Sequence, residues 1–265
     1  MRHIGLIIIG DEILSGKRQD KHLPKVIELL SARGLAVSWA RYVGDHRGHI
    51  TAALSDAFAS GDIVFSCGGI GATPDDHTRQ CAAAALGRPL ALHPQAKELI
   101  LERMRDVAKE QNLPYQPDRD DNQHRLNMGV FPEGAELIAN PYNKIPGFSV
   151  GDVHFVPGFP VMAHPMIEAL LDGRYAALHG SHAQQERSVI VAGSMEATLT
   201  PLMEALEARH DGIKVFSLPS VDHPTLGRHI ELGVKGRPGT LDAAFAEMCA
   251  GLEKLGAQYR TDVVR

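Results

Sequence analysis

An unbroken apolar run from Ile4 to Ile9 constrains the fold more than any other feature of this sequence. A strand without polar alternation is typical of a parallel sheet whose two faces are both covered by helices. Amphipathic helical patterns and further short apolar runs follow it in alternation. This order predicts an α/β fold of three layers, α/β/α, with a mostly parallel sheet and right-handed crossovers.

Hydrophobic periodicity, together with glycine and proline stops, places the elements of this first part of the chain. We expect a strand over 4–9, a helix over 23–30, a strand over 35–43, a helix over 50–58, a strand over 62–66, a helix from Pro74–Asp75 to Gly87, an exposed helix over 93–112, a strand over 153–156 and a helix ending near Leu171. The polar stretch over 116–123 is expected to be a loop.

The periodic signal fades between Asp172 and Glu186, which predicts a domain boundary there. The expected domains are residues 1–175 and 186–265, the second being a small α+β module. Its expected elements are a strand over 188–192, a helix over 197–208, strands over 213–218 and 228–234, and a helix over 241–255 with Thr240 as N-cap and Gly256 as stop.

Glycines and carboxylates follow each of the first three predicted strands. The first is followed by Gly10-Asp11-Glu12, the second by Gly44-Asp45, and the third by the glycine-rich segment 68–78. Ligands of open α/β sheets bind beyond the carboxyl ends of the strands, so we expect one shared pocket there. Glycine amides can approach a phosphate, and a helix starting near Asp75 would add its positive end.

The chemistry of this pocket has two interpretations. Thr73 and Thr78 carry hydroxyl groups that can donate to a bound anion. Carboxylates repel phosphate, so they need another partner. One possibility is a divalent cation that is held by Asp75 and Asp76, together with Asp45 or Glu12, and that also binds the phosphate. The other is that the carboxylates accept hydrogen bonds from the N–H groups of a heterocycle such as a pterin or guanine. The residues alone leave both open.

Several other classes of protein are excluded by the sequence. A phosphate-binding P-loop has four residues between its two glycines and a Ser or Thr after its lysine. Here five residues separate Gly10 from Gly16 and Arg18 follows Lys17, so this segment is not a P-loop. A net charge of −5 and 5% aromatic residues disfavour nucleic-acid binding. We expect no membrane association, because the early apolar run is too short. Three cysteines without C-x-x-C spacing suit a reducing cytoplasm, where we expect this protein.

The glycine-rich string Gly68-Gly69-x-Gly71-x-Thr73-x-x-Asp76-x-Thr78 resembles the G-G-x-G-x-T-x-x-D-x-T pattern of the MoaB/Mog family of molybdopterin-binding domains, which serve molybdenum-cofactor biosynthesis. Other segments are similar to the CinA branch of that family, up to about residue 170: 10–16, Asp20, 43–45, 74–76, 131–135, 146–148 and 157–160. The segment 188–265 resembles the small α+β domain that follows in CinA proteins.

The resemblance implies a MoaB/Mog-like three-layer fold and a homo-oligomer. It implies Asp45 and Asp76 as catalytic residues and Asp75 with Asp76 as ligands of Mg²⁺ or a similar ion. The ligand-binding residues implied for a molybdopterin or nucleotide are Gly10, Asp11, Glu12, Ser15, Gly68, Gly69, Gly71, Thr73 and Thr78. Three functions compete: a pterin- or nucleotide-binding protein, and a metal-dependent pyrophosphatase acting on ADP-ribose-like dinucleotides. The third is a non-catalytic adaptor whose C-terminal module binds another protein, with the charged helix over 93–112 as its contact surface.

The chain departs from the CinA pattern in three places. The usual D-T-N reads Asp20-Lys21-His22, the Glu after Pro-Gly-x-Pro-x is Met162, and the N-x-x-Q-A segment is replaced by residues 125–129. These changes remove polar groups from the expected pocket rim. The basic residues that we expect as replacement phosphate partners are Lys17, Arg18, Lys21 and Lys144.

Overall fold

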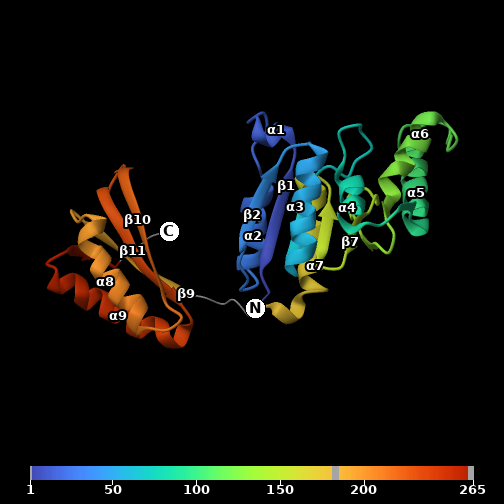
Figure 1. The fold of residues 1–265 in the computed structure, drawn as a ribbon. Helices are drawn as coiled ribbons and strands as arrows, with labels where there is room; N and C mark the ends of the chain where they lie inside the picture. The colour runs from blue at the N-terminus through green and yellow to red at the C-terminus, as the bar shows by residue number, and fades with distance from the viewer. Residues whose placement is uncertain (1, 181–184, 262–265) are drawn as a thin grey trace. The chain divides into compact units, whose positions relative to one another are not determined.

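The computed structural model describes residues 2–180 and 185–261, and the chain forms two compact units, residues 1–181 and 182–265 (Figure 1). Residues 181–184, inside the predicted domain boundary, lie outside the described residues. Each unit has a hydrophobic core of its own.

The first unit is built on a six-stranded sheet with the order β2-β1-β3-β8-β7-β6. Strands β2, β1, β3 and β8 run parallel to one another, β7 is antiparallel to β8, and β6 is antiparallel to β7. The strands are β1 (Ile4–Ile9), β2 (Trp39–Val43), β3 (Ile63–Cys67), β6 (Glu136–Ile138), β7 (Gly147–Val150) and β8 (Val153–Val156). The predicted mostly parallel sheet is confirmed.

Helices cover both faces of this sheet, which confirms the three-layer fold (Figure 1). One face packs against α2 (His22–Ser31) and α7 (Pro160–Asp172). The other packs against α3 (Arg47–Ser60), α4 (Thr78–Leu86) and α5 (Pro94–Glu110).

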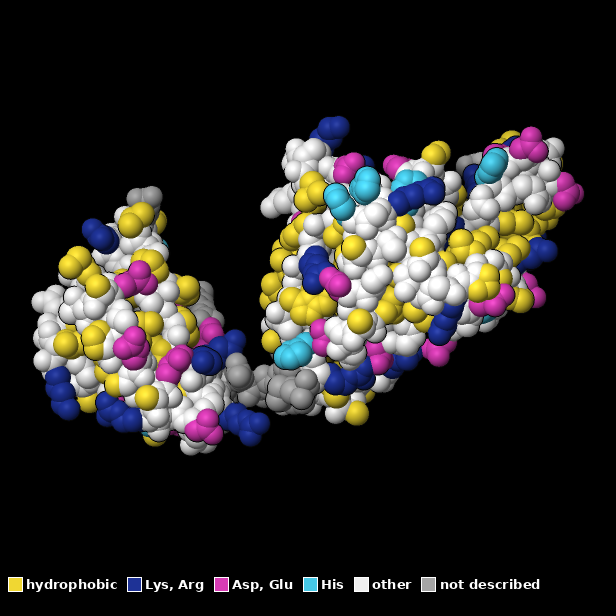
Figure 2. Space-filling model, viewed as in Figure 1, with side chains coloured by type: hydrophobic (Ala, Val, Ile, Leu, Met, Phe, Trp, Pro, Cys, Tyr) yellow, Lys and Arg dark blue, Asp and Glu magenta, His cyan; other side chains and the backbone are white. Residues whose placement is uncertain are grey.

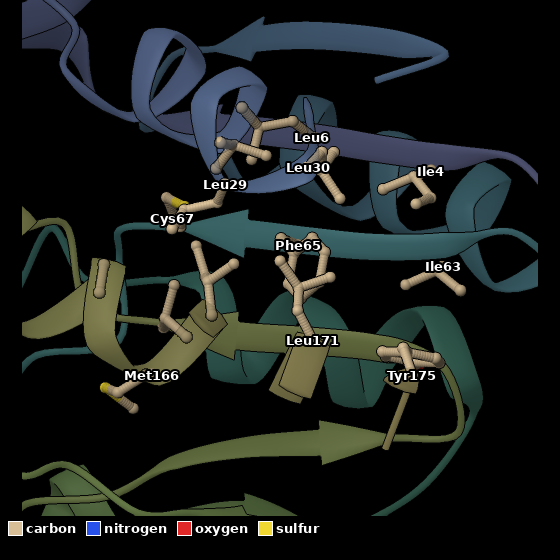
Figure 3. Close-up of a cluster of buried hydrophobic side chains, with 14 of the residues drawn as sticks. Ile4, Leu6, Leu29, Leu30, Ile63, Phe65, Cys67, Met166, Leu171 and Tyr175 are labelled. Atoms are coloured by element: carbon tan, nitrogen blue, oxygen red, sulfur yellow. The ribbon is translucent and has the colours of Figure 1, made fainter. Parts of the chain in front are cut away.

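The core on the α2 and α7 face is drawn in Figure 3. Leu6 of β1 and Phe65 of β3 are fully buried there against Leu30 of α2 and Leu171 of α7. The unbroken run 4–9 is buried along its whole length, because its alternate side chains enter the two cores on opposite faces. These rigid parallel strands hold the loops that follow them.

Some predicted boundaries in this unit are wrong. The helix expected from Pro74–Asp75 begins at Thr78, because residues 68–77 form an irregular loop tied by side-chain hydrogen bonds. The strand expected from residue 35 begins at Trp39. The stretch 116–123, expected to be a loop, overlaps the short helix α6 (Asp120–Arg125).

The remaining elements of the first unit are α1 (Asp11–Leu14), the paired strands β4 (Leu90–Leu92) and β5 (Val130–Pro132), and the 3₁₀ turns η1 (Leu126–Gly129) and η2 (Ala176–Leu178).

The second unit is an antiparallel sheet of order β10-β11-β9-β12 that packs one face against two helices. Its elements are β9 (Gln185–Ala192), α8 (Glu196–Arg209), β10 (Lys214–His223), β11 (Gly227–Gly236), α9 (Pro238–Lys254) and β12 (Gln258–Arg260). This β-α-β-β-α-β order is the split β-α-β, or ferredoxin-like, arrangement. The small α+β fold predicted here is confirmed.

The predicted N-cap of α9 is wrong. The cap is Arg237, and Thr240 lies within the first turn, where its hydroxyl donates to the Arg237 carbonyl at 3.3 Å. Gly256 follows the last turn with φ +66, as expected for a helix stop. Among the helices of residues 2–180 and 185–261, none combines the length and the apolar character needed to cross a membrane.

Candidate functional site

The loops after β1 and β2 are joined by reciprocal hydrogen bonds at the carboxyl edge of the sheet. The Asp11 N–H donates to the Asp45 carboxylate at 2.9 Å, and the Asp45 N–H donates to the Asp11 carboxylate at 3.1 Å. The Gly10 N–H also donates to the carbonyl of Val43, the last residue of β2, at 3.0 Å. Both aspartates therefore fix backbone geometry in addition to contributing charge.

The glycine loop after β3 packs tightly against its neighbours. Gly68 has φ +106, and a Cβ there would lie 2.4 Å from the carbonyl oxygen of Ile9. Gly69 has φ +69, and a Cβ there would lie 2.2 Å from the hydroxyl of Thr78. The Gly68 N–H donates to the Val156 carbonyl of β8 at 3.0 Å. Only glycine fits this backbone, so the loop has a defined shape beside three strand ends.

The two threonines expected to contact a ligand make hydrogen bonds within the glycine-rich segment. The buried Thr78 hydroxyl donates to the Gly68 carbonyl at 3.0 Å, and the Thr78 N–H donates to the Gly69 carbonyl. The Thr73 hydroxyl and N–H both donate to one carboxylate oxygen of Asp76. These residues shape the loop, and their hydroxyl protons are already engaged.

A cavity of about 520 Å³ opens between these loops, and we call it the acidic cavity. It brings together most of the predicted site: Gly10, Glu12, Asp45, Gly68, Gly69, Gly71, Thr73, Asp75 and Asp76. Predicted site residues outside its lining are Asp11, Ser15 and Thr78. Of the basic residues predicted to bind phosphate, Arg18 lines the acidic cavity. Lys144 forms ion pairs with Glu102 and Asp106, each at 2.6 Å.

Clustered negative charge is the main electrostatic feature of the acidic cavity. Burial raises the pKa of Asp45; the hydrogen bond from Asp11 opposes this, and the nearby carboxylates of Asp11, Glu12 and Asp75 add to it. The ionised form of Asp45 is therefore disfavoured in the free protein, which favours a ligand that donates N–H groups to it or carries positive charge.

The expected metal ligands do not form a ready-made cation site. Among residues 2–180 and 185–261, no three His, Cys, Asp or Glu side chains converge closely enough to hold a metal ion. One oxygen of Asp45 accepts from the Asp11 N–H, and one oxygen of Asp76 accepts from Thr73 twice. The described side chains alone therefore do not hold a metal ion, and a cation here would need further ligands from a bound substrate.

The segment after β8 also lines the acidic cavity; only the resemblance to CinA proteins placed it near the pocket rim, and the sequence assigned no role to Phe159. Pro157, Gly158 and Phe159 follow β8 and line the cavity, and the Phe159 side chain is 56% exposed. Their position after a fourth parallel strand is the signal that would have indicated it. His22, which replaces the asparagine of the CinA pattern, is buried and donates from Nε2 to the Gly158 carbonyl at 3.1 Å.

Comparison with known proteins decides the family. Residues 5–179 match the family described as "Probable molybdopterin binding domain". The chain belongs to this family. A family relative of nearly equal length is Protein TV0584 of Thermoplasma volcanium, 30% identical over 268 residues, which cover 98% of this chain and 97% of that protein.

CinA-like proteins are also similar to this chain. One from Anaeromyxobacter dehalogenans is 35% identical over 162 residues, which are 60% of this chain but 37% of that longer protein. Among solved structures, CinA of Thermoplasma acidophilum, described as of unknown function, superposes with a TM-score of 0.53 at 27% identity. That match covers 64% of this chain and 96% of the other. The predicted resemblance to MoaB/Mog and CinA proteins is thus confirmed.

Proposed function

We propose that this chain binds a pterin or a nucleotide in the acidic cavity. The observation that carries the proposal is the convergence of a glycine loop and four carboxylates, Glu12, Asp45, Asp75 and Asp76, in one cavity beyond the parallel strand ends. Carboxylates accept hydrogen bonds from the N–H edge of a pterin or guanine ring. The volume of about 520 Å³ suits a ligand of that size. The family description supports the pterin in particular.

The exposed ring of Phe159 supports a planar ligand. Aromatic side chains on the wall of a polar cavity offer a stacking surface for heterocycles, worth about 1–3 kcal/mol per ring. We expect Phe159→Ala to weaken binding by roughly 5- to 100-fold, the equivalent of that energy. Val161→Ala is the matched control, because Val161 is 53% exposed two residues away and is not part of the cavity lining.

Calorimetric titration of the full chain tests the proposal. The probes are a water-soluble pterin, GMP and ADP-ribose. We expect saturable binding of at least one of them, weakened tenfold or more by Asp45→Ala and unchanged by Asp56→Ala, whose exposed carboxylate lies on α3 and pairs with Arg41. No binding of any probe to folded protein would refute the proposal.

A metal-dependent pyrophosphatase is the second candidate. The four carboxylates of the acidic cavity would attract a divalent cation, and Mg²⁺ is commonly held by one or two carboxylates together with substrate phosphates. In that reaction water adds to one phosphorus of ADP-ribose and the P–O–P bridge breaks, which releases AMP and ribose 5-phosphate. AMP release that requires Mg²⁺ or Co²⁺, stops with EDTA and is lost in Asp76→Asn would replace simple binding as the function. A non-catalytic adaptor would keep its partner binding in both Asp45→Ala and Asp76→Asn.

A further inference from the structure

A second cavity of about 450 Å³ lies on the other side of the loop 72–76, and we call it the basic cavity. Ala72, Thr73 and Asp76 contribute to both cavities, so this loop is their common wall. The other residues lining the basic cavity are Arg47, Pro74, His77, Arg79, Gln80, Leu90, Asn127 and Val130. Figure 2 shows basic and histidine side chains gathered over the neighbouring ends of α3 and α4.

Arg79 is a buried cation with too few partners. Its side chain is 4% exposed, and one terminal nitrogen donates to the Gly71 carbonyl at 2.6 Å. Its Nε is buried without any acceptor. Within the part of the chain that the structure describes, Arg79 has no carboxylate at ion-pair distance. A buried charge is costly unless it is paired, so this guanidinium favours an anion beside it.

Arg47 and His77 add donors at the same cavity. The Arg47 Nε–H donates to His77 Nδ1 at 3.2 Å, and because a guanidinium only donates, the neutral His77 ring carries its proton on Nε2. The exposed Arg47 makes no ion pair with the described carboxylates. Two guanidinium groups and one imidazole N–H therefore surround the cavity, opposed by Asp76, which already accepts two hydrogen bonds from Thr73.

The N-terminus of α4 opens into the basic cavity. The helix begins at Thr78, the side chain of its N-cap residue His77 does not cap it, and its first-turn residues Arg79 and Gln80 line the cavity. Sequence analysis assigned this positive helix end to the glycine loop. The helix begins at Thr78, whose N–H donates to the Gly69 carbonyl of the glycine loop, and the next two residues of its first turn, Arg79 and Gln80, line the basic cavity.

We propose that the basic cavity is a binding site for the phosphate group of a small phosphorylated molecule, separate from the acidic cavity. A dianion would pair with the Arg79 and Arg47 guanidinium groups, accept from His77 Nε2–H and lie at the helix N-terminus. A phosphate fits this donor set better than a carboxylate does, because it offers more acceptor oxygens and a second negative charge.

Titration of the full chain with inorganic phosphate, followed by calorimetry and ³¹P NMR, tests the proposal. We expect saturable binding that is weakened tenfold or more in Arg47→Gln and unchanged in Arg41→Gln, an exposed arginine on β2. Arg79→Gln, verified as folded by circular dichroism, should lose binding as well. Phosphate should raise the Tm of the wild-type chain and not that of Arg47→Gln.

Two results would overturn the proposal: no phosphate binding to the wild-type chain, or binding lost in Arg18→Gln and kept in Arg47→Gln, which would place the anion in the acidic cavity. Titration with AMP identifies the source of the phosphate. If AMP and inorganic phosphate compete, and the binding of both is lost in Arg47→Gln, the site takes the phosphate of a nucleotide. Phosphate binding without competition from AMP supports the free anion. The Asp45→Ala variant separates failure here from failure of the proposed function, because Asp45 lines the acidic cavity and not the basic one.

Discussion

Asp45 combines two roles that oppose each other energetically. Its carboxylate holds the Asp11 backbone, and it also adds charge to an already acidic cavity. Charges placed together for a ligand commonly reduce the stability of the free protein. The cluster is therefore better explained by ligand binding than by folding.

We predict that Asp45→Asn stabilises the ligand-free chain at pH 7. The pKa of Asp45 is raised in the folded state, mainly by burial, so its stabilising contribution is present below its unfolded pKa and is lost as the pH rises through the folded value. Asparagine keeps an oxygen for the Asp11 N–H and removes the charge. We expect a rise in Tm of about 1–3 °C at pH 7, measured by thermal melts. The rise should disappear near pH 3, and a lower Tm at pH 7 would contradict the charge argument.

A buried polar chain at the opposite edge of the sheet has a defined proton order. The Tyr175 hydroxyl donates to Asp152 at 2.7 Å, so its oxygen accepts from His154 Nε2–H, and His154 Nδ1 accepts from Ser149 at 2.7 Å. Burial lowers the pKa of His154 to about 3. The contribution of His154 to stability is thus complete above pH 6.5 and decreases as the pH falls toward 3.

We predict that Tyr175→Phe destabilises the first unit by about 1–3 kcal/mol, because His154 Nε2–H then has no acceptor in the core. Urea unfolding at pH 7 measures this. Tyr115→Phe is the control, because Tyr115 is 38% exposed. An equal, small effect of both substitutions would show that the buried chain contributes nothing.

At the scale of elements, the glycine loop is the part of the site where the backbone itself is specified. Gly68 and Gly61 both have positive φ, at +106 and +71, but only Gly68 is pressed against the carbonyl of a neighbouring strand. An added Cβ at Gly68 would meet both an unfavourable φ and the Ile9 carbonyl, whereas at Gly61 it would meet an unfavourable φ with open space around it.

We predict that Gly61→Ala costs about 1 kcal/mol, the conformational penalty alone. Gly68→Ala should cost clearly more, about 3 kcal/mol or above, because the added Cβ would lie 2.4 Å from the Ile9 oxygen and β1 would have to shift. Urea denaturation of both variants measures the difference. Equal costs would mean that the loop can move away from β1 freely.

The sequence predicted elements where burial imposes a pattern. The apolar runs 4–9 and 153–156 could be recognised as strands because the sheet buries both of their faces. The short strands β6 and β7 lack such a pattern and were not predicted. The predicted start of α4 was too early, because side-chain hydrogen bonds keep residues 73–77 out of the helix. The bonds from Thr73 to Asp76 and from Thr78 to Gly68 cannot be recognised from hydrophobic periodicity.

The candidate site was predictable in its residue types and not in its geometry. Three Gly–Asp loops at one sheet edge followed from the parallel topology. The direction of each side chain did not: Thr78, predicted to bind a ligand, donates its hydroxyl proton to the Gly68 carbonyl. Phe159 and the basic cavity depend on tertiary contacts between segments far apart in the sequence.

At the scale of the whole molecule, the two units have separate cores, which predicts separable stabilities. Leu232 of β11 is fully buried in the core of the second unit. Leu232→Ala should destabilise that unit by about 2–5 kcal/mol and leave ligand affinity in the first unit unchanged. Two-probe denaturation and calorimetric titration check this. A parallel loss of affinity would show that the units are coupled.

The homo-oligomer implied by the resemblance stays a prediction, and analytical sedimentation of the full chain tests it.

Binding in the acidic cavity can be tested directly by a chemical-shift map of the ¹⁵N-labelled full chain during titration with a pterin or nucleotide that binds. We expect the amide signals of Gly10, Gly68, Gly69 and Gly71 to shift with the ligand concentration, and those of Gly61 and Gly87, outside the cavity lining, to stay unchanged. Saturable binding that leaves the four loop glycines unchanged and shifts signals elsewhere would contradict it.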